Sequence, residues 1–209
     1  MELTYSELED FLAEIHRVAP EKRTALKGRL KHFQRLGWPA GTNKGKGARV
    51  QYGIGQTMML AMGMELLQLG LTPERIVLQF KFSTRLLADS FAEALYEYGP
   101  HSDDIFYIFS PESLHSLTGD EDEFWLRSVV SSRSKLNTFF DAEIFRSARR
   151  FAFINISEIL YEYITYFVDK GLGDPQRLRE PIENWQRIGA AEIDKAGFIS
   201  ARGADDGNP

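Results

Sequence analysis

The chain has 209 residues, 43% of them hydrophobic and 26% charged, a balance from which one large or two small folded domains are expected. The absence of cysteine excludes disulfides, thiolate metal sites and cysteine nucleophiles. The net charge of −5 hides an asymmetry: ten Lys or Arg residues and one acid between His16 and Tyr52 carry +9, leaving −14 elsewhere, which favours a local polyanion-binding surface over a merely solvated basic face.

Two amphipathic helices are predicted at the N-terminus. Apolar residues at helical spacing indicate a first helix over about 5–17, with Ser6 as N-cap and Glu9 completing a capping box. A second helix is expected over about 21–36, where a glycine and a proline follow. Two helices joined by a short turn are typical of a helix-turn-helix.

The second helix has two different sides. One side is apolar and is expected to pack on the first helix: Ala25, Leu26, Leu30, Phe33 and Leu36. The other side offers donors suited to phosphates and base edges: Arg23, Thr24, Lys27, Lys31, Gln34 and Arg35. Lys22 and Arg29 fall near the apolar boundary and would have to extend to solvent.

The segment after the second helix, residues 38–52, is rich in glycine and lysine. Glycine and asparagine supply turn conformations, and Val50 and Tyr52 alternate with polar neighbours as in a short strand. We interpret this segment as a two-stranded wing whose tip carries Lys44 and Lys46, positioned to lie along a phosphate backbone.

A second helix pair follows. Residues 55–69 form an apolar, Met-rich helix, and Thr72 caps another helix whose first residue is Pro73. That helix is expected to reach about Tyr98, with a bend near Ser83. The Gly-Pro step at 99–100 then marks a domain boundary.

The remainder is predicted to be a small α+β domain. Strands are expected over 105–109, 124–130 and 150–156. One helix face is marked by Ile156, Leu160, Tyr163 and Phe167. One more short helix is expected within 174–191, and the small, polar segment 200–209 is expected to be disordered.

No catalytic or metal-binding pattern is found. The glycines around Lys44 lack Walker spacing, the four histidines are scattered, and the acidic run 120–123 lacks the spacing of a calcium loop. Ser131–Ser134 has no flanking glycines and is not a nucleophile elbow. We therefore expect a protein that is not an enzyme and needs no cofactor or metal.

Three stretches carry a resemblance to a known family: Arg35-Leu36-Gly37-Trp38-Pro39, residues 47–52 (GARVQY) and residues 65–76 (ELLQLGLTPERI). With the order of predicted elements, the first eighty or so residues resemble the DNA-binding domain of the MerR family of bacterial transcription regulators. The spacing Arg49-x-x-Tyr52 departs from the family's Arg-x-Tyr, and the family's long coiled coil is not evident.

The resemblance implies a dimer with a winged helix and a second helix pair that binds pseudo-palindromic sites. It implies that Arg23, Thr24 and Lys27 lie at the major groove. It implies phosphate contacts from the wing residues Lys44, Lys46 and Arg49, with Tyr52 supporting the wing.

The sequence therefore predicts a mixed α+β protein, with a mainly helical winged helix-turn-helix at 1–99, an α+β domain at 100–199 and a disordered tail at 200–209. The α+β domain at 100–199 could dimerise, bind an effector or contact a partner. Ten DNA-binding residues are proposed: Lys22, Arg23, Thr24, Lys27, Lys31, Arg35, Lys44, Lys46, Arg49 and Tyr52.

The expected activity is sequence-specific binding of double-stranded DNA by a transcription regulator. The expected partners are duplex DNA, a second copy of the chain and RNA polymerase. No apolar run reaches the roughly 20 residues that span a bilayer, so no membrane association is expected. The acidic N-terminus lacks a signal-sequence pattern, and a soluble, cytoplasmic and nucleoid-associated protein is expected. The alternative is an interaction or scaffold protein whose basic segment binds RNA or an acidic partner.

Overall fold

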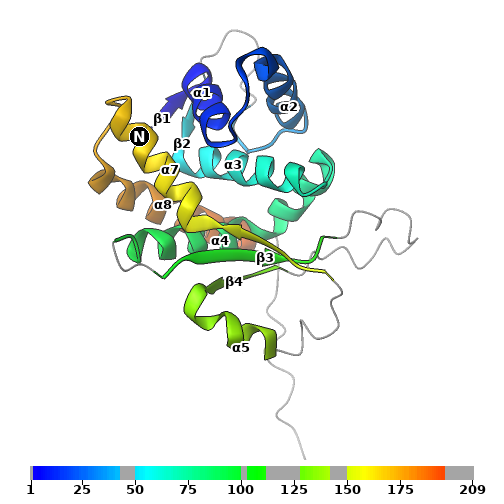
Figure 1. Ribbon diagram of the computed structural model, residues 1–209, viewed down its shortest axis with the longest axis vertical. Helices are drawn as coiled ribbons and strands as arrows, with labels where there is room; N and C mark the ends of the chain where they lie inside the picture. The colour runs from blue at the N-terminus through cyan, green and yellow to red at the C-terminus, as the bar shows by residue number, and fades with distance from the viewer. Residues whose placement is uncertain (1, 43–49, 100–102, 112–127, 142–149, 196–209) are drawn as a thin grey trace, which may run out of the picture.

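The computed structural model describes residues 2–42, 50–99, 103–111, 128–141 and 150–195 (Figure 1). The predictions for Lys44, Lys46, Arg49, the tail 200–209 and the first part of the strand 124–130 lie outside these residues. Within the described ranges the fold is mixed α+β, with a two-stranded and a three-stranded sheet, both antiparallel. No helix in these ranges is both long and apolar enough to cross a membrane.

The chain begins with strand β1 (Glu2–Thr4) and helix α1 (Tyr5–Ile15). The capping box predicted at Ser6 and Glu9 is wrong, because the helix is capped at Thr4. Thr4 Oγ1 accepts from the backbone N–H of Glu7 at 3.3 Å, and the Glu7 carboxylate accepts from the N–H of Thr4 at 2.7 Å. Thr4-x-x-Glu7 and the predicted Ser6-x-x-Glu9 have the same pattern. The strand decides between them, because it holds Thr4 in the extended geometry of an N-cap.

A 3₁₀ turn (Pro20–Lys22) leads into helix α2 (Arg23–Arg35). Strand β2 (Gln51–Gly53) pairs with β1, with Leu3 opposite Tyr52. Strand β1 was not predicted from the sequence, because three residues are too few to show an alternation. The two-stranded wing predicted within 38–52 is therefore wrong in its described part: β2 pairs with the N-terminal strand β1, and residues 38–42 form no strand.

Helices α3 (Ile54–Gln68) and α4 (Pro73–Tyr96) follow. The predicted cap is confirmed, since Thr72 Oγ1 accepts from the N–H of Arg75 at 3.4 Å. The predicted bend is confirmed at Ser83, whose φ of −121° and ψ of 16° are not helical. Its hydroxyl donates to the carbonyl of Gln79 at 2.7 Å, a contact that often accompanies bent helices.

The later part of the chain contains three strands and three helices within the described residues: β3 (Ile105–Phe109), β4 (Ser128–Ser132), α5 (Leu136–Asp141), β5 (Ala152–Asn155), α7 (Ile156–Asp169) and α8 (Arg179–Lys195). Strand β3 lies between β4 and β5. Ile105, Tyr107 and Phe109 point into the main core, whereas Ile108 joins a small cluster on the other face, where Leu136 of α5 packs. The predicted apolar face of α7 is confirmed: Ile156, Leu160, Tyr163 and Phe167 are all buried.

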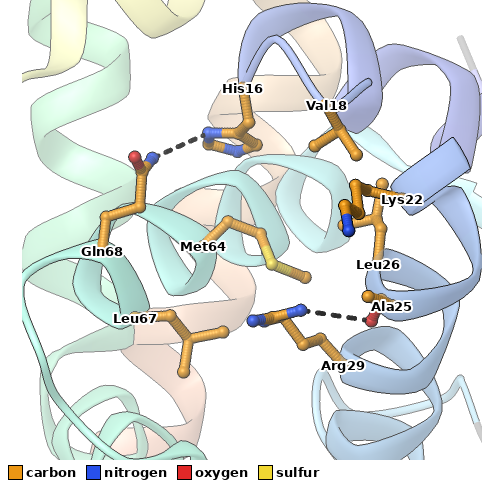
Figure 2. Close-up of a pocket in the computed structure, with 9 residues that line it drawn as sticks. All are labelled: His16, Val18, Lys22, Ala25, Leu26, Arg29, Met64, Leu67 and Gln68. Carbon is orange, nitrogen blue, oxygen red and sulfur yellow. Dashed lines mark hydrogen bonds between the residues drawn. The ribbon is translucent and has the colours of Figure 1, made fainter. Parts of the chain in front are cut away.

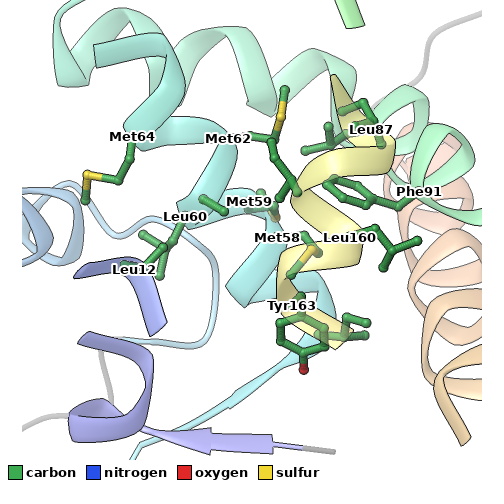
Figure 3. Packing of buried hydrophobic residues seen from close by; sticks show 14 of the residues in the cluster. Leu12, Met58, Met59, Leu60, Met62, Met64, Leu87, Phe91, Leu160 and Tyr163 are labelled. Carbon is green, nitrogen blue, oxygen red and sulfur yellow. The ribbon is translucent and has the colours of Figure 1, made fainter. Parts of the chain in front are cut away.

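One continuous core joins the first 99 residues to the rest of the chain. Figure 3 shows Met58 and Met62 of α3 beside Phe91 of α4 and Leu160 of α7 in this core. The ring of Phe11 in α1 also packs edge-on against Tyr163 of α7, with centroids 5.4 Å apart. The proposed boundary at residue 99 therefore does not divide the described residues into two separate cores.

Candidate nucleic-acid interface

One face of α2 is directed to solvent and carries four of the seven predicted contact residues that the structure describes. We call it the outer stripe: Thr24, Lys27, Gly28, Lys31 and Arg35. All five are exposed and recur three or four positions apart, so they share one side of the helix. The opposite side buries Leu26, Leu30 and Phe33 in the core.

The cations of the outer stripe differ in how they are paired. Among the described residues, Lys31 and Arg35 take part in no ion pair. The Nζ of Lys27 lies 3.2 Å from Glu9 Oε2, and Glu9 is itself only 9% exposed. Lys31 and Arg35 are thus the cations most available to a partner, while Lys27 is shared with α1.

Arg23 lies beside the outer stripe and is held by α1. Its Nη1 donates to Asp10 Oδ1 at 2.9 Å and lies 3.9 Å from Glu9 Oε1. The Arg23 guanidinium is the main cause that lowers the pKa of the Asp10 carboxyl, and Lys170 of α7, 3.6 Å away, adds to it. The predicted groove residue Arg23 would therefore have to leave these carboxylates to contact a base.

Lys22 does not join the outer stripe. It lies with Arg29 on the other side of α2, where both line a pocket against α3 (Figure 2). The structure thus separates the described cations into an outer group, a group paired with α1 and a group facing α3. The sequence pattern already placed Lys22 and Arg29 away from the rest, near the apolar boundary.

Both ends of the segment that carries Lys44, Lys46 and Arg49 are anchored by Gln56 in the first turn of α3. Its Oε1 accepts from the N–H of Gly53 at 3.1 Å, and its Nε2 donates to the carbonyl of Ala40 at 2.7 Å. Ala40 and Gly53, which lie on either side of this segment in the sequence, are therefore both held beside α3.

Tyr52 is buried at 1% exposure, which rules out direct contact with a nucleic acid. Its hydroxyl accepts a 2.7 Å hydrogen bond from Gln34 Nε2, and burial raises the pKa of the Tyr52 phenol. The expected role of Tyr52 in supporting the wing stays a prediction. Gln34 and Gln56, which hold the strand and the loop ends, could not be identified from sequence, because their partners are distant along the chain.

Gly28 was not among the predicted contact residues, although a glycine in the middle of a helix is a detectable signal. A Cβ built at this position would meet no atom within 4 Å. Gly28, Lys31, Gln34 and Arg35 border an open hollow of about 490 Å³. Nothing among the described residues requires glycine here, so the helix backbone is open on that side to close approach by a partner.

The described residues contain no group of His, Asp or Glu side chains arranged to hold a metal ion. No protein-family model, curated protein or solved structure matches the chain.

Proposed function

We propose that this protein binds double-stranded DNA and regulates transcription, with the outer stripe of α2 in the major groove. The observation that carries the proposal is the exposure of Lys27, Lys31 and Arg35 on one helix face around Gly28. The major groove of B-DNA is wide enough for an α-helix, and its edges present acceptors to Lys and Arg.

The charge distribution supports the same proposal. The chain is acidic overall, at −5, yet its densest group of cations lies on α2 and in the segment that follows. Each Lys or Arg that neutralises a phosphate releases counterions, so binding should be salt-dependent. Lys44, Lys46 and Arg49 are proposed to contact the backbone from the segment anchored by Gln56.

The order of elements supports a winged helix-turn-helix of the MerR type. Helices α1 and α2 are joined by residues 16–22, β1 and β2 form a ribbon at the end of the loop, and α3 and α4 form the second helix pair. Dimerisation on pseudo-palindromic sites, contact with RNA polymerase and a nucleoid location follow from the same resemblance and belong to the proposal.

The test is duplex binding by fluorescence anisotropy, with a pool of random short duplexes at several salt concentrations. We expect Lys31→Gln and Arg35→Gln each to lower the affinity about fivefold to tenfold near 0.1 M salt, and to reduce the salt slope by about 0.9 per lost contact. Arg177→Gln is the matched control, because Arg177 is exposed in the 3₁₀ turn before α8, away from the outer stripe.

Sequence selection from the same duplex pool tests base recognition. The wild-type protein should enrich a related set of sites, and the outer-stripe variants should enrich them less. Equal losses in Arg177→Gln, or no retention of any duplex at low salt, would overturn the proposal. Tighter binding to double-stranded RNA or to polyglutamate than to DNA would replace it with the scaffold alternative.

A further inference from the structure

A pocket lies between α2 and α3, on the side of α2 away from the outer stripe (Figure 2). Leu26 of α2 and Met64 of α3 form its buried floor, and the half-buried Val18 and Leu67 extend that apolar surface. The pocket has a volume of about 310 Å³, at the small end of the range for ligand pockets. This α2–α3 pocket therefore suits a small organic molecule.

Two cations stand at its mouth. Lys22 and Arg29 are exposed, and Figure 2 shows them on either side of Met64. Neither has a carboxylate partner within the described residues, and no Asp or Glu lines the pocket. Arg29 donates only to the carbonyl of Ala25 in its own helix, at a long 3.4 Å. The positive charge at the mouth is thus free to bind an anion.

The other end of the pocket is formed by His16, whose side chain is 6% exposed. Its Nδ1 lies 3.1 Å from Glu65 Oε1 and 3.3 Å from Gln68 Nε2, whereas its buried Nε2 has no hydrogen-bond partner in the described part of the chain. Because Glu65 and the nearby Glu162 face His16, an anionic group belongs at the opposite end, near Arg29.

We infer that the α2–α3 pocket binds a small organic monocarboxylate. The apolar body covers Leu26 and Met64, and the carboxylate accepts charge-assisted hydrogen bonds from Lys22 and Arg29. The site lies across α2 from Lys31 and Arg35, so it does not depend on duplex binding.

The test is a titration of the full chain, labelled with ¹³C at the methionine methyl groups, with sodium octanoate. Met64 reports on the pocket, while Met58, Met59 and Met62 lie in the core among α3, α4 and α7 and serve as internal controls (Figure 3). We expect a saturable shift confined to Met64, with a dissociation constant on the order of 1 mM or below. The unperturbed core signals also report that each variant is folded.

Three comparisons test the role of charge. Octan-1-ol should bind about twofold to fivefold more weakly than octanoate, the effect of an exposed ion pair, and inorganic phosphate should not shift Met64. Arg29→Gln and Lys22→Gln should weaken octanoate by a similar factor and leave octan-1-ol unchanged, whereas Lys31→Gln, the matched control on the outer stripe, should bind octanoate normally. The inference would be overturned if octan-1-ol and octanoate bound with equal affinity. It would also be overturned if Lys31→Gln weakened octanoate binding as much as Arg29→Gln does, or if the signals of all the methionines shifted. None of these outcomes depends on whether the chain binds DNA.

Discussion

Gln34 donates a 2.7 Å hydrogen bond from its Nε2 to the hydroxyl of Tyr52, which joins α2 to the strand β2. Tyr52 is buried, and β2 begins two residues after the segment 43–49. The bond therefore fixes strand β2 relative to the outer stripe. We expect mutation of Gln34 or Tyr52 to show that this bond stabilises the fold at the proposed interface.

Replacing Gln34 with alanine should lower the free energy of unfolding by about 1–3 kcal/mol, because the Tyr52 hydroxyl is left buried without its donor. Tyr52→Phe removes the same bond and should cost about 0.5–1.5 kcal/mol. Urea denaturation of both variants and of the double variant measures the coupling. The free energy of unfolding should fall less in the double variant than the sum of its decreases in the two single variants. Strictly additive decreases would contradict an energetic link between these side chains.

Asp10→Asn should raise the affinity for duplex DNA about threefold at low salt. The substitution releases Arg23 from its 2.9 Å partner and removes a negative charge near the proposed phosphate contacts. Glu14→Gln is the control, since it makes the same charge change but its partner is Lys170, 3.8 Å away. Equal gains in both variants, measured by anisotropy, would show a net-charge effect and no release of Arg23.

Gly28→Ala should stabilise the protein by about 0.5–1 kcal/mol, because alanine favours a helix interior and its Cβ meets no atom of the described residues. Gly28→Gln should fold equally well but weaken duplex binding about tenfold or more, since its side chain would occupy the surface proposed to face the groove. Thermal unfolding and anisotropy on the same samples separate the two effects. Unchanged duplex affinity in Gly28→Gln would place the interface elsewhere.

The ion pair of Asp10 and Arg23 predicts a pH dependence of stability. Because Arg23, and then Lys170, lower the pKa of Asp10 in the folded protein, its contribution is fully present above the ordinary carboxyl pKa of about 4. The contribution is lost as the pH falls through the lowered folded-state pKa. The stability difference between the wild type and Asp10→Asn should therefore shrink when urea midpoints are compared from pH 6 down to pH 3. A difference independent of pH would refute the assignment.

Gly55→Ala should destabilise the fold by about 1–3 kcal/mol, because the new Cβ would lie 2.8 Å from the Trp185 ring of α8. Gly28→Ala, expected to change stability in the opposite direction, is the matched control.

Circular dichroism and tryptophan fluorescence should report one coincident unfolding transition, since α3 and α8 contribute to one core. Two separate transitions would instead support independent domains divided near residue 99.

Local signals predicted much of the fold correctly. The cap at Thr72, the bend at Ser83 and the strand 105–109 agree with the structure. Predictions failed where a distant partner decides the outcome. Leu36, expected on the buried side of its helix, is 36% exposed because α2 ends at Arg35, and the cap lies at Thr4 because β1 pairs with β2.

The amino-acid sequence by itself determined which side of α2 is buried and that many cations surround it, because helical periodicity and composition are local properties. Only the tertiary structure decided which cations remain available. Lys31 and Arg35 face solvent, Arg23 pairs with Asp10 of α1, and Arg29 faces the pocket against α3. Electrostatic pairing depends on distances of a few ångströms, and those distances are set by packing between helices that are separate along the chain.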